Sequence, residues 1–505
     1  MQINIFYDIW MDNGIENFYN ILKSIPEGVS ANLKNDGLEF KILDKTAFLE
    51  YLENKINYKR DTIAFYWDKD KKTGEVRNIK KDWVLIQYGK KVKGKNILKE
   101  KIYSDTKERL KEIFDSSSKT GKQTCILCNK PFSKKVDKLK QSIYPFVTKI
   151  KSLSGIRKLD YTYNELCPMC YLIGSLQWCD EGIIYRTFPN KGHSIIFLPK
   201  SNDLKQLKEF KSKYSIILDN SYRNSNIKTL THKVDEEEGV EYPTGEYNTL
   251  LCFFEKFLIK CCFEEEENAW MSFESVKKSS CKDWTCINIP SGQVKNINTT
   301  NINIAEDILG VMYNLTKEDI LIYQSIIMKL LFLKEHNADW DITNQIREDL
   351  SKYFITDNFK GFSHSLLPKK QGKVSFPKDA RSILDDFIYE WRLKKMGIRK
   401  EDLKNIKSVA NLVAETAVKS TSLLYRLDKT RTLSDFWDSL REISRKMILL
   451  DEKTKQKIKP SSLDDLIQII TENEDSWQDI RNLLVIYSCM YYSIKTYAHD
   501  GGEKQ

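Results

Sequence analysis

The chain has few of the residues and motifs on which common enzyme classes depend. Five histidines occur in 505 residues, and none is followed two positions later by glutamate, as in the zinc deaminases. The sequence contains neither a Gly-x-Ser-x-Gly nucleophile motif nor a Gly-x-Gly-x-x-Gly dinucleotide-binding motif. We therefore predict no catalytic residue and expect a binding protein rather than an enzyme.

Long apolar runs are also missing. No segment approaches the ~20 uninterrupted apolar residues of a membrane-spanning helix, and no basic region precedes an apolar stretch at the start of the chain, as in a signal peptide. We expect a soluble, cytoplasmic protein with no membrane partner. Eleven cysteines in 505 residues are too few for a disulfide-rich secreted protein. Most of them, including Cys179, Cys252 and the pair Cys261-Cys262, are interpreted as buried small apolar side chains.

Four cysteines form two Cys-x-x-Cys motifs, Cys125-Ile-Leu-Cys128 and Cys167-Pro-Met-Cys170. Each motif directs two thiolates toward one point, and two motifs supply the four sulfur ligands that Zn²⁺ prefers. A redox role is less compatible, because redox Cys-x-x-Cys motifs occur singly. Four thiolates leave no open coordination position, so we predict one structural Zn²⁺ bound by Cys125, Cys128, Cys167 and Cys170.

The segment around these motifs is strongly basic. Residues 119–158 contain eleven Lys and Arg and one acid, Asp137, and their net charge of +10 equals that of the whole chain. A cationic segment of this kind is suited to a phosphate backbone. We expect phosphate contacts from Lys119, Lys122, Lys130, Lys134, Lys135, Lys138 and Lys140.

Apolar spacing predicts an α+β fold. Residues 1–118 mix helix and strand, with a short helix at 15–22 that is capped by Asp12-Asn13-Gly14, and strands at 62–67 and 83–88. The zinc-clasped basic insertion spans 119–180 and contains a strand-like run at 172–176. Residues 181–355 complete the mixed N-terminal body, with strand-like runs at 183–188 and 194–198 and helices from 305. We expect a linker at 356–379 and an all-α C-terminal helical bundle at 380–505.

Two polar segments outside the insertion are further candidates. Gly89 to Asn96 nearly matches a phosphate-binding loop, but Asn96 replaces the hydroxyl that ligates Mg²⁺. Nucleic-acid contacts explain its lysines more simply, although a solvated turn explains them as well. These lysines are Lys90, Lys91, Lys93 and Lys95. In the polar loop 291–303, Gln293, Lys295 and Asn296 could meet base edges or act as a wedge; an ordinary surface loop is the alternative.

The C-terminal bundle carries a weaker basic signal. Residues 392–446 hold fourteen basic residues against seven acids. A helical face with Arg392, Lys394, Lys395, Arg399 and Lys400 could follow a phosphate backbone. A solvated helix surface is the competing interpretation.

Taken together, these residues resemble a known family. The two Cys-x-x-Cys motifs flanking a basic loop, with Cys167-Pro-Met-Cys170 running into Tyr-Leu-Ile-Gly174, resemble the CXXC–CXXC branch of the large subunits of type I CRISPR interference complexes (Cascade), of subtype I-B. The opening Asp8-x-Trp10-x-Asp12-Asn13-Gly14 is similar to that family's N-terminal signature. The resemblance covers mainly residues 1–30 and 120–180.

The resemblance implies a non-catalytic role in antiviral defence. A large subunit of this kind binds near the guide RNA, reads a protospacer-adjacent motif in double-stranded DNA, assists duplex opening and holds the displaced single strand. Its partners are the other Cascade subunits and a separate helicase-nuclease. Two other classes stay open: a zinc-stabilised RNA- or DNA-binding accessory protein outside CRISPR, and a metal-dependent nuclease with carboxylate ligands that the sequence does not reveal.

Overall fold

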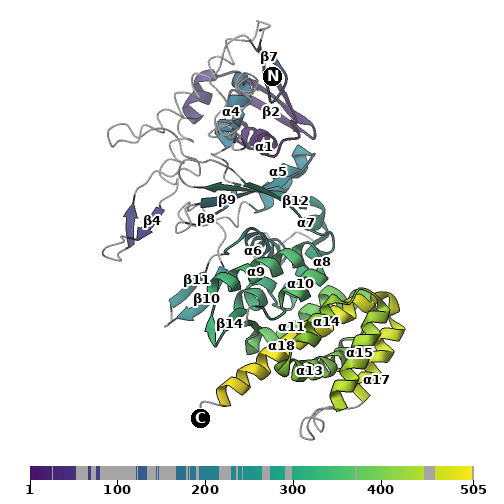
Figure 1. Cartoon of the computed structure of the whole chain (residues 1–505). Helices are drawn as coiled ribbons and strands as arrows, with labels where there is room; N and C mark the ends of the chain where they lie inside the picture. The colour runs from purple at the N-terminus through teal and green to yellow at the C-terminus, as the bar shows by residue number, and fades with distance from the viewer. Residues whose placement is uncertain are drawn as a thin grey trace, which may run out of the picture. The chain divides into compact units, whose positions relative to one another are not determined.

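The computed structural model describes most of the chain and divides it into two compact units (Figure 1). Unit 1 comprises Met1–Ile227 and Met271–Asn303, and unit 2 comprises Lys228–Trp270 and Ile304–Gln505. The described residues are 1–25, 27–52, 66–69, 76–79, 121, 123–132, 144, 146, 166–177, 180, 182–188, 193–214, 229–234, 237–241, 243–263, 273–290, 298–369, 372–448 and 461–502. None of the helices in these ranges is long and apolar enough to cross a membrane.

Unit 1 begins with a three-stranded antiparallel sheet that packs on helix α1. The strand order is β1 (Gln2–Asn4), β3 (Gly37–Ile42) and β2 (Val29–Lys34). Helix α1 (Ile9–Lys23) starts six residues earlier than the sequence suggested, because the Asp8 side chain caps it by accepting from the backbone N–H groups of Trp10 and Met11. Asp12, Asn13 and Gly14 therefore lie inside this helix instead of capping it.

Helix α4 (Pro168–Leu176) packs against α1. The strand-like interpretation of residues 172–176 was wrong, because a cap residue followed by Pro168 at the first helical position begins a helix here. Leu172, Ile173 and Leu176 then bury one face of it. A Cβ at Gly14 would lie 2.7 Å from the Ile173 side chain, so glycine permits the close approach of α1 and α4.

Unit 1 also contains a second sheet. Its four antiparallel strands follow the order β13 (Asn298–Asn303), β12 (Asp283–Pro290), β9 (His193–Lys200) and β8 (Ile184–Phe188). Strands β8 and β9 confirm the strands expected at 183–188 and 194–198. The end of the expected polar loop 291–303 is instead strand β13, which pairs with β12 along its length.

Unit 1 also contains two helices and a hairpin outside these sheets. Helices α5 (Leu204–Tyr214) and α7 (Phe273–Ser279) pack together. Strands β4 (Tyr66–Lys69) and β5 (Val76–Ile79) pair in an antiparallel hairpin. Strand β4 overlaps the expected strand at 62–67, whereas the expected strand at 83–88 lies outside the described residues.

The first part of unit 2 combines helices with short strands. Its elements are the hairpin β10 (Thr229–Val234) and β11 (Glu237–Glu241), α6 (Glu246–Leu258), η5 (Ile259–Phe263), α8 (Ile308–Lys317), η6 (Ile322–Ile326), η7 (Ile327–Lys329), β14 (Leu331–Lys334), β15 (Asn337–Ala338), α9 (Trp340–Ile355), α10 (Phe359–Ser365) and β16 (Gly372–Ser375). Strands β15, β14 and β16 form one small antiparallel sheet.

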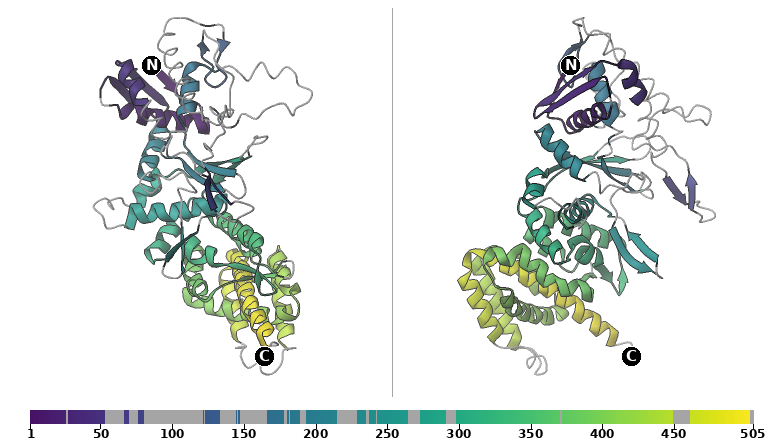
Figure 2. Two further views of the ribbon diagram at one scale, coloured as in Figure 1. Left: turned by 90° about the vertical axis from the view of Figure 1, so that its left-hand side faces the viewer. Right: turned by 180° about the vertical axis from the view of Figure 1, so that it is seen from behind.

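The second part of unit 2 is helical, as expected for the C-terminal region. Helix α18 (Trp477–Gly502) packs against α13 (Leu403–Lys419), α14 (Ser422–Lys429) and α15 (Leu433–Ile448) (Figure 2). The other elements are α11 (Lys378–Ile388), η8 (Tyr389–Leu393), α12 (Lys394–Met396), η9 (Lys400–Asp402), α17 (Ser461–Glu472) and η10 (Glu474–Ser476).

The linker expected at 356–379 was wrong, because this segment contains α10 and β16. Helix α10 packs on α9 and α18. Phe359 and Phe362 are buried, and the centroid of each ring lies 5.1 Å from that of Trp391. These apolar contacts join the helices after residue 380 to the preceding elements, so the C-terminal bundle is part of the larger unit 2 rather than a body of its own.

Two carboxyl groups, of half-buried Glu348 and buried Glu255, cap helices within unit 2. Glu348 on α9 accepts hydrogen bonds from the N–H groups of Tyr247 and Asn248 at the start of α6, at 2.7 and 3.0 Å. Glu255 on α6 accepts one from Tyr323 N–H in η6 at 2.6 Å. Burial raises the pKa of Glu348 to about 7 and that of Glu255 to about 8. Each side chain thus accepts hydrogen bonds from N–H groups at the start of another helix, where these groups have no acceptor within that helix.

Candidate metal centre

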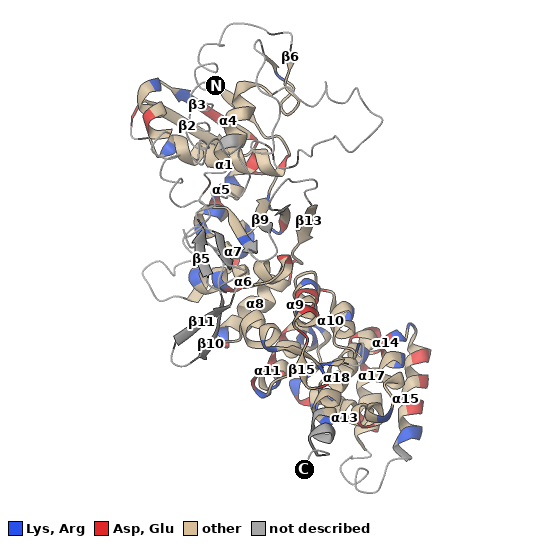
Figure 3. Ribbon diagram, turned by 60° about the vertical axis from the view of Figure 1, so that its left-hand side comes forward, with Lys and Arg blue, Asp and Glu red and all other residues tan. Residues whose placement is uncertain are grey.

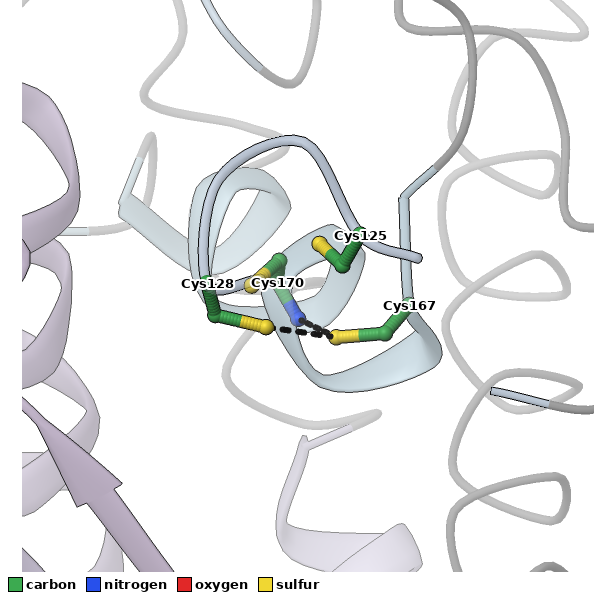
Figure 4. Close-up of side chains that lie close together, drawn as sticks. All are labelled: Cys125, Cys128, Cys167 and Cys170. Atoms are coloured by element: carbon green, nitrogen blue, oxygen red, sulfur yellow. Dashed lines mark hydrogen bonds between the residues drawn. The ribbon is translucent and has the colours of Figure 1, made fainter. Parts of the chain in front are cut away.

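The first Cys-x-x-Cys motif forms a tight turn between two short strands. Strands β6 (Gln123–Thr124) and β7 (Pro131–Phe132) pair in antiparallel register. Between them, Cys125 N–H donates to Lys130 O at 3.0 Å and Asn129 N–H donates to Cys125 O at 2.8 Å. Asn129 has a φ of 55°, a left-handed conformation that asparagine tolerates better than most residues. The turn directs Cys125 and Cys128 to the same side (Figure 4).

The second motif begins helix α4. Cys167 is the N-cap residue, and its Sγ accepts from Cys170 N–H at 3.4 Å. One helical turn separates Cys170 from this cap, which brings both thiols to the N-terminal end of α4. Figure 4 shows the sulfur atoms from the turn and from the helix gathered together.

The four sulfur atoms fit a tetrahedral metal site. All lie within 4.8 Å of one another, and the Sγ atoms of Cys128 and Cys167 are 3.7 Å apart. A Zn–S bond of about 2.3 Å places tetrahedral sulfur ligands about 3.8 Å from each other. A disulfide would require about 2.05 Å, and all four cysteines are free thiols. The structure therefore brings together the ligand set expected from the sequence, in a geometry that could hold one metal ion.

The electrostatics of the site favour a cation. Hydrogen bonds from Cys128 and the other two thiols lower the pKa of Cys125. Hydrogen bonds with Cys125, Cys128 and Cys167 raise the pKa of Cys170, and its burial raises the pKa further. Four thiolates can share this space only if a positive ion offsets their mutual repulsion. Three of the four side chains are buried and Cys128 is partly exposed.

Helix α4 is anchored at its C-terminal end. Beyond its C-terminal end, Asp180 lies in a buried ion-pair network, in which Lys211 Nζ of α5 is 2.5 Å from an oxygen of Asp180 and 2.5 Å from an oxygen of Glu16 on α1. The side chain of Asn17 donates to Leu176 O at 2.8 Å. These contacts join the C-terminal end of α4 to α1 and α5, whereas Cys167 and Cys170 lie at its N-terminal end.

The signature-like opening Asp8 to Gly14 has structural roles in unit 1. Asp8 caps α1 and accepts a hydrogen bond from Tyr144 OH. Asp12 is buried and accepts from Phe6 N–H at 2.7 Å; burial raises its pKa to about 7. Asn13 donates to Pro199 O at 3.0 Å. Tyr144 comes from the basic insertion, so this contact places one point of the insertion beside the start of α1.

Most of the predicted nucleic-acid contacts lie outside the described residues. This holds for Lys90, Lys91, Lys93, Lys95, Lys119, Lys122, Lys134, Lys135, Lys138, Lys140, Gln293, Lys295 and Asn296. Lys130 is described and exposed, and its Nζ donates to Gln2 O at 3.1 Å. Cys179 is also outside the described residues, whereas Cys252 and Cys261 are buried as expected and Cys262 is partly exposed.

The basic face expected at residues 392–400 is neutralised by acids of the same unit. Arg392 pairs with Asp357 at 2.9 Å, and Lys395 lies 3.1 Å from Asp307. The other three cations have carboxylate partners as well: Lys394 with Glu390, Arg399 with Asp402 and Lys400 with Asp386. Lys and Arg stand beside Asp and Glu on the helices of unit 2 (Figure 3). These five residues therefore form a helix surface on which every cation is paired with a carboxylate. Such a surface is less suited to a phosphate backbone than its sequence suggested.

The contact between Tyr144 and Asp8 and the Lys211 network were not predicted from the sequence, because residues far apart in the chain form them. Within the described ranges, the four cysteines are the one group of three or more His, Cys, Asp and Glu side chains arranged to hold a metal. No protein-family model matches the chain, and no curated protein matches it.

Proposed function

We propose that Cys125, Cys128, Cys167 and Cys170 bind one structural Zn²⁺. The sulfur spacing, the burial of three ligands and the convergence of a turn with a helix end support this assignment. When bound, the metal neutralises the thiolates and crosslinks the turn to α4. Four protein ligands leave no position for a substrate, so the role of the ion is to hold the fold.

Elemental analysis of the purified chain tests this assignment. We expect one zinc per chain, and well under one in a Cys128→Ser variant, which removes the most accessible ligand. Cys262→Ser, a partly exposed cysteine outside the cluster, is the matched control and keeps the metal. Iron in place of zinc, or no metal in the parent, would overturn the assignment.

The second proposal is that the chain binds nucleic acid as the non-catalytic large subunit of a type I Cascade. One observation carries it: the sulfur atoms of Cys128 and Cys167 are 3.7 Å apart, so the proposed metal clasps both ends of the segment between them. That segment, residues 129–166, has nine basic and three acidic residues and a net charge of 9 − 3 = +6. A basic segment fixed at both ends is suited to a phosphate backbone.

The specific role follows the family resemblance of the Cys-x-x-Cys pair and the Asp8–Gly14 opening. In this role the protein reads the protospacer-adjacent motif, assists duplex opening beside the guide RNA, holds the displaced strand and presents the complex to a helicase-nuclease. Gln293, Lys295 and Asn296 are proposed to meet the DNA at the motif. The lysines of the insertion are proposed to contact guide-RNA or DNA phosphates.

Copurification tests the assembly. The tagged chain, expressed with the neighbouring genes of its source, is expected to retain guide RNA and other Cascade subunits through a high-salt wash. Binding to duplex DNA is then measured for the parent and for a variant with Gln at Lys134, Lys135, Lys138 and Lys140. Each lost phosphate contact should lower the salt slope by about 0.9 with duplex DNA.

The outcomes separate the candidate functions. Nucleic-acid binding without guide RNA or Cascade subunits would favour the accessory protein outside CRISPR. Cleavage of labelled DNA in the presence of Mg²⁺ or Mn²⁺ would favour the nuclease. An unchanged salt slope in the insertion variant would mean that those lysines only solvate the segment or face a protein partner.

A further inference from the structure

The outer face of the first sheet of unit 1 holds a polar cleft. Strands β1, β3 and β2 bury apolar side chains on the inner face, where the ring centroid of Phe40 lies 5.4 Å from that of Phe18 on α1. The alternate residues of each strand therefore point to the outer face. A cleft of about 580 Å³ opens there, a volume typical of small-ligand sites. The polar side chains that line it belong to Gln2, Ser30, Asn32, Glu39 and Lys41.

Within this cleft a carboxylate stands between two primary amides. In the strand register, Glu39 of β3 is opposite Gln2 on one side and Asn32 on the other, so these three side chains are neighbours on one face. Lys34 Nζ donates to Glu39 at 2.6 Å, but a carboxylate can accept about four hydrogen bonds. The Gln2 amide donates to Asn4 at 3.2 Å, whereas the Asn32 amide has no partner among the described residues. Glu39 therefore keeps acceptor capacity beside amide groups that can still donate.

Two lysines accompany these groups. Lys41 lies opposite Ser30 in the next row of the same face. It is exposed and has no carboxylate partner in the part of the chain that the structure describes. Lys130 of the first Cys-x-x-Cys turn donates to Gln2 O at 3.1 Å, and its ammonium group keeps two further N–H donors. Because Lys130 belongs to the basic segment 129–166, this contact brings the start of that segment to the cleft.

We propose that this cleft binds an unpaired guanine base of a nucleic-acid strand. The assignment rests on the proposed nucleic-acid function and deepens it by naming the base. The Watson–Crick edge of guanine presents two adjacent N–H donors and one carbonyl oxygen, and this edge is accessible in a single strand. Glu39 accepts from the two donors, the Asn32 amide donates to the carbonyl oxygen, and the two lysines contact the neighbouring phosphates.

The same arrangement discriminates against the other bases. Adenine and cytosine each place a ring nitrogen with a lone pair beside their amino group, and this lone pair is repelled by a carboxylate. Uracil and thymine have a single N–H between two carbonyl oxygens. None of these edges offers two adjacent donors to Glu39, so each leaves a partly desolvated carboxylate without its full set of hydrogen bonds.

The test uses the full-length chain and fluorescence anisotropy with labelled oligothymidine strands of equal length. One strand is unsubstituted, and the others carry a single central guanine, adenine or cytosine. The guanine strand should bind about 5- to 150-fold more tightly than the others, the range for one good bidentate contact to a base. The same set made of RNA, with uridine in place of thymidine, shows which kind of strand the site takes.

The diagnostic variant is Glu39→Gln, which removes the double acceptor but keeps the size of the side chain. It should bind all four strands with similar affinity, so that the guanine preference is lost. The ratio of two affinities is compared at one salt concentration, because a change in net charge then affects both strands alike. Glu209→Gln is the matched control: this exposed carboxylate on α5 also pairs with a lysine, Lys213, at 2.7 Å, and its loss should keep the preference.

A guanine preference that Glu39→Gln removes and Glu209→Gln keeps supports the site. A parent that binds the strands without preferring guanine overturns the site alone, as does a preference that survives in Glu39→Gln. The insertion variant with Gln at Lys134, Lys135, Lys138 and Lys140 is measured in parallel and should weaken binding to all strands by the same factor. A parent that binds none of the strands would overturn the nucleic-acid function together with the site.

Discussion

The buried carboxyl group of Glu255 makes the stability of unit 2 depend on pH. This side chain on α6 is 4% exposed and accepts a hydrogen bond from the N–H of Tyr323, in the π-helical segment η6. Burial raises its pKa from 4.5 to about 8, while the backbone N–H groups of η6 act in the opposite direction. Near neutral pH the folded protein therefore holds a protonated carboxyl group at the start of η6.

The sign and size of the effect follow from the two pKa values. Between 4.5 and about 8 the folded state keeps the proton and the unfolded chain releases it, so stability is highest at low pH and falls as pH rises through this window. At about 1.4 kcal/mol per pH unit, the full difference is on the order of 5 kcal/mol. A Glu255→Gln variant keeps an acceptor oxygen but cannot ionise, so this pH dependence should disappear.

Amide hydrogen exchange in residues 322–326 measures the local opening of this region. Parent and variant are compared at the same pH, from about pH 5 to about pH 8.5, so that intrinsic exchange rates cancel. We expect similar protection near pH 5 and much stronger protection in the variant near pH 8.5. Glu318→Gln, an exposed residue close by, is the control. Equal pH dependence in parent and Glu255→Gln would refute the reasoning, because the η6 N–H groups would then stabilise an ionised carboxylate despite its burial.

Three further predictions concern the metal centre, the buried ion pairs and the boundary of unit 2. Chelation of the proposed Zn²⁺ should greatly speed amide exchange in β7 and α4 but not in α13, because structural zinc sites contribute on the order of 10 kcal/mol; equal effects in both units would contradict a local site. Lys211→Met strands two buried carboxylates and should destabilise unit 1 by about 3–5 kcal/mol in urea unfolding, whereas exposed Lys205→Met should have little effect. A fragment of residues 376–505 should lack fixed tertiary structure by near-ultraviolet circular dichroism, because it loses the α9 and α10 rings around Trp391; cooperative melting of this fragment would show that it folds alone.

Local patterns in the sequence were sufficient for the metal ligands and for many of the elements. The two Cys-x-x-Cys motifs are short, and each forms within one turn or at one helix end, so their spacing alone indicated a shared site. Alternating apolar residues predicted β8 and β9, and helical spacing predicted the C-terminal helices. Local pattern failed where a cap changed the outcome: Asp8 starts α1 early, and Cys167 with Pro168 turns an apparent strand into α4.

Contacts between distant residues decided the rest. The segment 356–379 has the Gly, Pro and Lys content of a linker, yet Phe359 and Phe362 pack around Trp391 and make it part of unit 2. Residues 392–400 look basic in sequence, but their acidic partners, such as Asp307 and Asp357, come from elsewhere in the chain. Asp428 likewise gathers Lys360 and His364 from another helix. Composition fixes how much charge a segment carries, but only the fold decides which charges are paired, because ion pairs and ring contacts depend on distance in space.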